Sequence, residues 1–239
     1  MTAPPGDRDQ IFADWDEWVG VLWNEVVRLH WHRAVWCEVR DEIQARTPHA
    51  DQTFLASYTA TYVTTALMTI RRLIDTDENT RSLVSLIAAI KRNPEVVTRT
   101  RYSEIRVERN PESAQWIPGK PEFERAWSSS LDPEHIDPAI LDGDVASLAA
   151  ELTHADAWAT KTIAHLDPRR PEVPMRFDDL DHAIDYVTAV YDKYQLLIRQ
   201  SSTTEYTPAI QGDWHEPLRA PLFWAGPDVW GWPHPYGYI

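Results

Sequence analysis

Hydrophobic residues recur along most of this chain at the three- and four-residue steps of an amphipathic α-helix. One stripe runs from about Gln10 to Arg46 and stops before Pro48, and a second runs from about Gln52 to Ile74. The apolar positions of the first stripe are Trp15, Trp18, Leu22, Val26, Leu29, Trp36, Val39 and Ile43. These patterns predict two long helices, each of which buries one face.

The pattern predicts further helices in the rest of the chain. A short one covers Arg81–Arg92, after which Pro94 suits the first turn of the next helix because proline lacks the N–H that a first turn leaves unpaired. Longer helices are expected over Leu141–Leu166 and Asp178–Gln200, with Asp178 as a candidate N-cap of the second. The expected fold class is therefore all-α, a helical bundle over residues 10–200.

In three segments the hydrophobic residues do not recur at a regular helical spacing. Residues 1–9 are expected to form a flexible N-terminal arm. Residues 110–138 contain five prolines and predict a long internal loop with one turn around Glu122–Trp127. Residues 201–239 contain six prolines and eight aromatic side chains, which is too aromatic for a solvated linker. We expect this irregular C-terminal extension to pack on the bundle or on a dimer partner.

Composition excludes several classes of protein. The chain has only eight glycines among 239 residues and contains neither a Gly-x-Gly-x-x-Gly nor a Gly-Lys-Ser/Thr phosphate loop. Its single cysteine, Cys37, cannot build a disulfide framework or a thiolate zinc site, and we interpret it as a small buried apolar residue. No apolar run approaches 18 residues and the first residues lack a hydrophobic signal core, so a cytoplasmic protein without membrane contact is expected.

Charge narrows the range of partners. A net charge of −14 argues against a surface that binds duplex DNA. The distribution is uneven, since the segment from Arg71 to Arg125 carries eleven basic and nine acidic side chains. A local surface for an anionic ligand is compatible with this balance.

The predicted helix over 141–166 carries a polar stripe as well as an apolar one. The stripe consists of Glu151, His154, Trp158, Lys161 and His165, at steps of three and four residues, and Asp167 follows at the end of the helix. Because the C-terminal end of a helix dipole is negative, it favours the protonated form of a nearby histidine. His165 is therefore a candidate general acid or base.

Two segments resemble a known family. The string ATKTIAHLD (Ala159–Asp167), followed by a proline-bearing loop and the helix opening FDDLDHAIDYV, resembles the end of a HEPN domain. The string ALMTIRRLIDTDENTRSLVSLIAAI (Ala66–Ile90) is similar to the AbiU-like HEPN branch associated with abortive phage infection. The resemblance spans roughly residues 10–200 in the same helix order.

This resemblance implies a helical bundle, a homodimer and a link to phage defence or toxin–antitoxin systems, with a cognate antitoxin as a further expected partner. Active HEPN proteins are ribonucleases that need neither a metal nor another cofactor. Their motif is an arginine, four to six residues, and a histidine. The histidine handles protons while the RNA 2′-hydroxyl attacks the phosphate, and the arginine stabilises the negative charge that develops.

The sequence departs from the motif at the arginine. If His165 is the family histidine, Ala159 occupies the arginine position and lies on the predicted apolar face. The binding of the RNA phosphate would then fall to Lys161, or to Arg71 and Arg72 on a neighbouring helix. Asp167 or His154 would orient the His165 imidazole. A formal match between Arg176 and His182 falls in a loop and at the start of the last helix, and we interpret it as a chance occurrence.

Two other functions stay open. Glu151-x-x-His154 and Asp179-x-x-His182 form a pattern found in di-metal helical bundles, although the first predicted helix offers no clear inward carboxylate to complete such a site. We therefore assign no metal ligand. Alternatively, the protein is a helical bundle without catalytic activity, and it binds RNA or a protein partner without cleaving RNA. Its aromatic tail residues would then be interface anchors: Trp214, Phe223, Trp224, Trp230, Trp232, Tyr236 and Tyr238.

Overall fold

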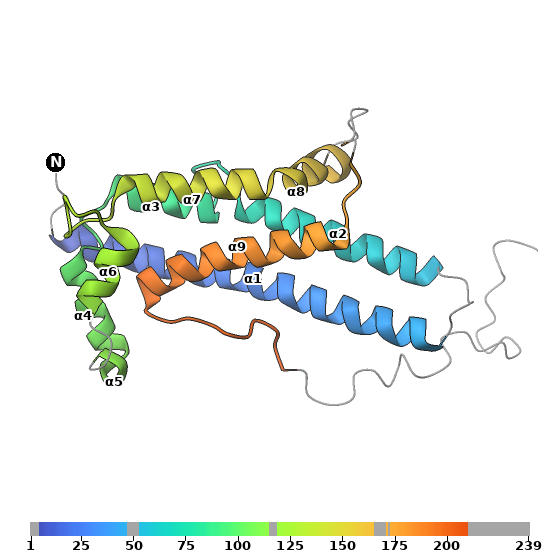
Figure 1. Ribbon diagram of the computed structural model, residues 1–239, viewed down its shortest axis with the longest axis horizontal. Coiled ribbons are helices and arrows are strands. Elements are labelled where there is room, and N and C mark those ends of the chain that lie inside the picture. The colour runs from blue at the N-terminus through green and yellow to red at the C-terminus, as the bar shows by residue number, and fades with distance from the viewer. Residues whose placement is uncertain (1–4, 47–52, 115–118, 165–170, 172, 210–239) are drawn as a thin grey trace, which may run out of the picture.

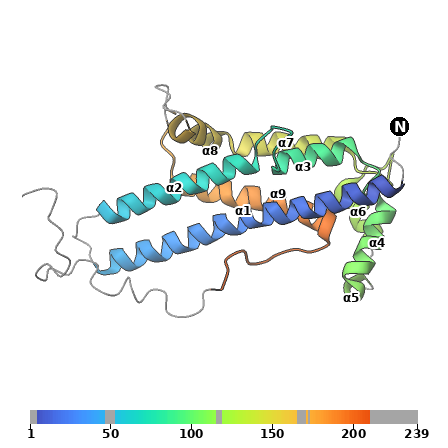
Figure 2. The ribbon, with the colours of Figure 1, turned by 180° about the vertical axis from the view of Figure 1, so that it is seen from behind.

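The computed structural model describes residues 5–46, 53–114, 119–164, 171 and 173–209, and within these ranges the protein is all-α. Three long helices form the body of the bundle: α1 (Pro5–Arg46), α2 (Thr53–Leu73) and α9 (Phe177–Arg199). Figures 1 and 2 show α2 and α9 both running alongside α1. The predicted all-α bundle is confirmed. No helix among the described residues is long and apolar enough to cross a membrane.

The first stripe forms the centre of the core. Leu22, Val26 and Leu29 of α1 are at most 1% exposed, as expected from their spacing. The helix begins at Pro5 rather than near Gln10, so residues 5–9 belong to it and not to an arm. Cys37 packs partly buried against the core, and burial raises the pKa of its thiol. The thiol therefore stays protonated at neutral pH, which fits a packing residue and not a nucleophile.

Side-chain caps set the start of the shorter helices. The Ser82 hydroxyl accepts the Ser85 N–H at the start of α3 (Leu83–Arg92), and the Thr98 hydroxyl accepts the Arg101 N–H at the start of α4 (Arg99–Arg109). The helix after α3 thus begins at Arg99, five residues later than Pro94 suggested. Capping supplies a partner for an N–H that the first turn would otherwise leave unpaired.

The proline-containing segment is more ordered than a long loop. Within residues 110–138 the structure contains α5 (Pro111–Ala114) and α6 (Gly119–Trp127), and the second includes the single turn expected there. Phe123 and Trp127 of α6 are buried, and Arg106 of α4 forms an ion pair with Glu122. Apolar and ionic contacts with α4 therefore hold a segment that its prolines suggested would be irregular.

The predicted helix over 141–166 is broken into three pieces. α7 (Pro138–Glu151) is followed by Leu152, then by α8 (Thr153–Trp158), then by the π-helix η1 (Ala159–Ala164). A π-helix bonds residue i to i+5 and is uncommon, occurring frequently at functional sites. The apolar stripe nevertheless continues into η1, where Ala159 is 0% exposed.

The last helix and the tail also differ from expectation. α9 begins at Phe177, with Arg176 as N-cap, and the Asp179 carboxylate accepts the Arg176 backbone N–H at 3.0 Å. Asp178, the predicted cap, lies inside the helix. Beyond α9, Tyr206 stacks on His30 and donates a hydrogen bond to Asp192, so the first part of the extension lies on the bundle. The tail aromatics from Trp214 to Tyr238 lie outside the described residues.

Candidate functional site

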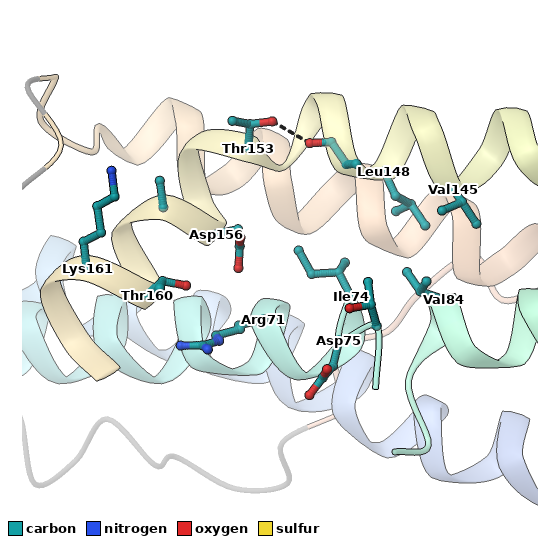
Figure 3. A pocket seen from close by; sticks show the side chains of 13 residues that line it. Arg71, Ile74, Asp75, Val84, Val145, Leu148, Thr153, Asp156, Thr160 and Lys161 are labelled. Carbon is teal, nitrogen blue, oxygen red and sulfur yellow. Dashed lines mark hydrogen bonds between the residues drawn. The ribbon is translucent and has the colours of Figure 1, made fainter. Parts of the chain in front are cut away.

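A cavity of about 540 Å³ opens where the C-terminal end of α2 meets α8 and η1 (Figure 3). Its walls also include residues from α3 and α7. The lining residues are Arg71, Ile74, Asp75, Thr76, Val84, Val145, Leu148, Ala149, Thr153, Asp156, Ala157, Thr160 and Lys161. The volume lies within the range of small-molecule and cofactor sites. The cavity combines an apolar wall with a few charged and hydroxyl groups.

Two of the predicted phosphate-binding side chains line this cavity. Arg71 comes from the last turn of α2 and Lys161 from η1. In Figure 3 the Arg71 guanidinium extends along α2 toward Thr160, whereas the Lys161 ammonium points away from Arg71. Within the part of the chain that the structure describes, neither cation forms a hydrogen bond or ion pair. A half-buried guanidinium with unused donors is suited to binding an anion.

Arg72 has a different environment from its neighbour. Its Nη2 donates to Glu25 Oε2 of α1 at 2.6 Å and lies 3.1 Å from the Thr69 hydroxyl. Consecutive residues on an α-helix point about 100° apart, so only one of two adjacent arginines faces the cavity. The structure therefore places Arg71 and Lys161 on the same cavity and directs Arg72 to Glu25 of α1.

Two carboxylates share the cavity with Arg71. Asp75 Oδ1 accepts the backbone N–H of Asp77 at 2.9 Å, so part of its hydrogen-bonding capacity is used. Asp156 of α8 forms no side-chain hydrogen bond or ion pair with any described residue. The sequence pattern did not single out Asp156 or Thr160. Their spacing with Thr153, at steps of three and four, was the available signal for a second polar face.

The position that the HEPN motif assigns to arginine is a core position. Ala159 is 0% exposed and packs within the hydrophobic core, as its place on the apolar stripe predicted. An arginine at this site would therefore be buried among apolar side chains. The candidate general acid or base, His165, and the candidate orienting group, Asp167, lie outside the described residues.

His154 faces another part of the molecule. Its Nε2 donates to the Val173 carbonyl at 3.1 Å, and the Trp158 indole donates to the same oxygen at 3.0 Å. His154 Nδ1 lies 3.8 Å from Asp179 Oδ2. The polar stripe is thus divided: Lys161 lines the cavity, while His154 and Trp158 hold the segment that leads into α9.

The pattern typical of di-metal bundles forms two separate pairs. His182 Nε2 lies 3.0 Å from Glu151 Oε2, and His154 approaches Asp179 at 3.8 Å. In the described ranges, no group of three or more His, Cys, Asp or Glu side chains is placed to hold a metal ion. The His182 ring is exposed and Arg176 lies at the N-cap of α9, so these two residues do not form a joint site with the cavity.

The all-α helical bundle is the architecture that the HEPN resemblance implies. Comparison with protein families gives the particular group: the AbiU2 model, HEPN AbiU2, matches residues 12–216. The chain belongs to this HEPN-type abortive-infection family, which confirms the resemblance seen in the Ala66–Ile90 and Ala159–Asp167 segments. No curated protein and no solved structure gives a significant match.

Proposed function

We propose that this protein binds RNA and holds a backbone phosphate in the cavity through Arg71. The observation that carries the proposal is a half-buried guanidinium, free of protein partners in the described residues, in a cavity of suitable size. A guanidinium presents several N–H donors in a planar fork that matches phosphate oxygens, and it stays charged at any working pH. The Thr160 hydroxyl adds a donor beside it, and Lys161 adds a mobile positive charge.

The net charge of −14 limits which part of the surface could bind RNA. A strongly acidic protein repels a polyanion at long range, so affinity has to come from a local site and not from a basic surface. A single-stranded segment fits this requirement, since unpaired nucleotides enter a cavity that a duplex cannot. The proposal therefore concerns single-stranded RNA.

Metal-independent cleavage is the second candidate function, and the position of Arg71 favours it. Arg71 supplies a guanidinium to the same cavity as η1, and the residue directly after η1 is His165. Arg71 of α2 would then take the role of the motif arginine, whose position in this chain is occupied by Ala159. His165 would take the proton from the 2′-hydroxyl as it attacks the phosphorus, and the departing 5′-oxygen would take up a proton from water. The products are a 2′,3′-cyclic phosphate and a free 5′-hydroxyl.

Cleavage is tested with purified protein, total RNA and transfer RNA in EDTA. A His165→Ala variant is assayed beside the wild type. Fragments with cyclic phosphate ends that disappear in the variant would establish the nuclease. Intact RNA, with a folded protein by circular dichroism and RNA retained in a binding assay, would establish RNA binding without cleavage.

We also propose the homodimer that the family resemblance implies, with an antitoxin as a second partner in the cell. Size-exclusion chromatography with light scattering tests the first part. A mass near twice 27.6 kDa is the expected result, and a mass near 27.6 kDa at high protein concentration would exclude a stable dimer.

A further inference from the structure

We infer that the cavity recognises a guanylate unit, with the phosphate on Arg71 and the guanine base on Asp156. The inference rests on the proposed function and adds the identity of the bound nucleotide. Figure 3 shows the Asp156 side chain directed from α8 toward α2, where Arg71 lies. Both side chains are half-buried and line one cavity.

The separation of these two charges is the central observation. Arg71 and Asp156 have opposite charges and face the same space, yet no ion pair joins them and neither has another side-chain partner in the described residues. A phosphate alone would gain from Arg71 but be repelled by the two carboxylates of the cavity, Asp156 and Asp75. A ligand that carries a negative group at one end and hydrogen-bond donors at the other satisfies both residues.

The apolar part of the cavity wall suits a base, and in Figure 3 it lies on the far side of Asp156 from the Arg71 guanidinium. Ile74, Val84 and Val145 contribute apolar surface from three different elements, and Ala157 lies beside Asp156 on α8. Flat aromatic ligands gain by burying their faces against such surface, while a few polar groups fix their orientation. A nucleotide has these parts in the required order: a planar base, a sugar and a phosphate.

The carboxylate selects among the four bases. An ionised carboxylate only accepts hydrogen bonds, and its two oxygens match two donors that lie side by side. On the pairing edge, guanine offers the adjacent N1–H and 2-amino group. Adenine and cytosine offer an amino group beside an acceptor nitrogen, and uracil offers one N–H between two carbonyl oxygens. Asp156 therefore favours guanine over the other bases.

Short labelled RNA oligomers test this inference by fluorescence anisotropy. The set contains U8, U4GU3, U4AU3 and an inosine version of the second, in which the 2-amino group is missing. A bidentate contact to a base contributes about 1–3 kcal/mol of discrimination, so wild-type protein should bind U4GU3 about tenfold more tightly than U8 or U4AU3. Inosine should lose most of that preference, and this comparison needs no protein variant.

Two variants and one competitor complete the design. Asp156→Ala removes the carboxylate and keeps a good helix former, and it should bind all four oligomers within about twofold of one another. Glu108→Ala, which removes an exposed carboxylate on α4, should keep the guanine preference. Free guanosine monophosphate, added as an unlabelled competitor and titrated alone by calorimetry, separates an RNA guanylate from a free nucleotide.

Each outcome has one meaning. A guanine preference that Asp156→Ala abolishes supports the inference. Equal binding of all oligomers, weakened by Arg71→Gln, overturns guanine recognition but leaves the RNA-binding function standing. Binding of the free nucleotide without any RNA binding supports guanylate recognition and overturns the RNA function. Absence of binding by both RNA and nucleotide overturns both.

Discussion

Arg71 of α2 and Asp156 of α8 line the same cavity without forming an ion pair, and neither has another side-chain partner among the residues described. Folded proteins usually satisfy half-buried charges with each other or with backbone groups. The neighbouring Arg72 has a partner even though it is exposed, since it binds Glu25 at 2.6 Å. Two charged side chains on one cavity, both without a partner in the described ranges, are therefore the basis of the proposed binding site.

Restoring the family arginine should damage the fold. Ala159 is 0% exposed, so Ala159→Arg places a long charged side chain in the core, at an expected cost of at least about 3 kcal/mol. For a chain of this size that corresponds to a melting temperature lower by roughly 6 °C or more. Thermal unfolding followed by circular dichroism measures the change.

The matched control is Ala164→Arg, at the exposed end of the same π-helix. It should leave the melting temperature within about 2 °C of wild type. Equal stability of the Ala159→Arg variant and wild type would show that position 159 accepts an arginine, and the buried alanine would no longer explain the lost motif.

Acid should destabilise the protein through His30. Burial, aided by the nearby Arg33 guanidinium, lowers the pKa of His30 from 6.5 to about 4, although Asp185 and Glu205 act in the opposite direction. A histidine whose pKa is lower when folded binds more protons in the unfolded state. The free energy of unfolding should therefore be fully present above pH 6.5 and fall as the pH drops toward 4, by at most about 1.4 kcal/mol per pH unit.

The measurement is urea unfolding of wild type and of His30→Gln between pH 7 and 4. The wild-type free energy should fall more steeply in this window than that of the variant. His135→Gln, which alters an exposed ring paired with Asp132, should keep the wild-type slope. Parallel curves for wild type and His30→Gln would contradict the role of His30.

Chelation should change neither the fold nor RNA binding. Glu151 and His182 form one exposed pair and His154 approaches Asp179 separately, so these side chains do not converge on a common point. The melting temperature and the RNA dissociation constant are expected to agree within error with and without EDTA. Because exposed ion pairs contribute little, His182→Ala should cost less than about 1 kcal/mol. A large stabilisation by added zinc or manganese would restore the metal-site hypothesis.

The helix positions were largely predictable because burial repeats with the period of the helix. Leu22, Val26 and Leu29 were identified from spacing alone and are at most 1% exposed. The break at Leu152 was not predictable in the same way. Leu148, Leu152 and Ala155 keep a regular apolar step, and no glycine or proline marks the interruption. The hydrophobic pattern records which residues are buried but not whether a helix is continuous.

The candidate site was predictable only in part. Arg71 and Lys161 were both predicted to be phosphate ligands, and the structure places them on one cavity. The choice between Arg71 and Arg72 needed the fold, since it depends on Glu25 of a distant helix. Asp156 carried no motif, and its importance lies in the absence of a partner among the described residues. Whether a side chain has a partner depends on the folded structure, so the local sequence does not predict it.

The most direct test of phosphate binding at Arg71 is a titration of labelled U8 RNA with wild type, Arg71→Gln and Arg72→Gln at several salt concentrations. We expect Arg71→Gln to weaken binding about tenfold, since a hydrogen bond to a charged group contributes about 1.5–3 kcal/mol. Its salt slope should fall by about 0.7, which corresponds to one lost phosphate contact on a single strand. Arg72→Gln, one residue away but turned to α1, should stay within about twofold of wild type. Wild-type affinity in Arg71→Gln, or an equal loss in both variants, would contradict a phosphate site in this cavity.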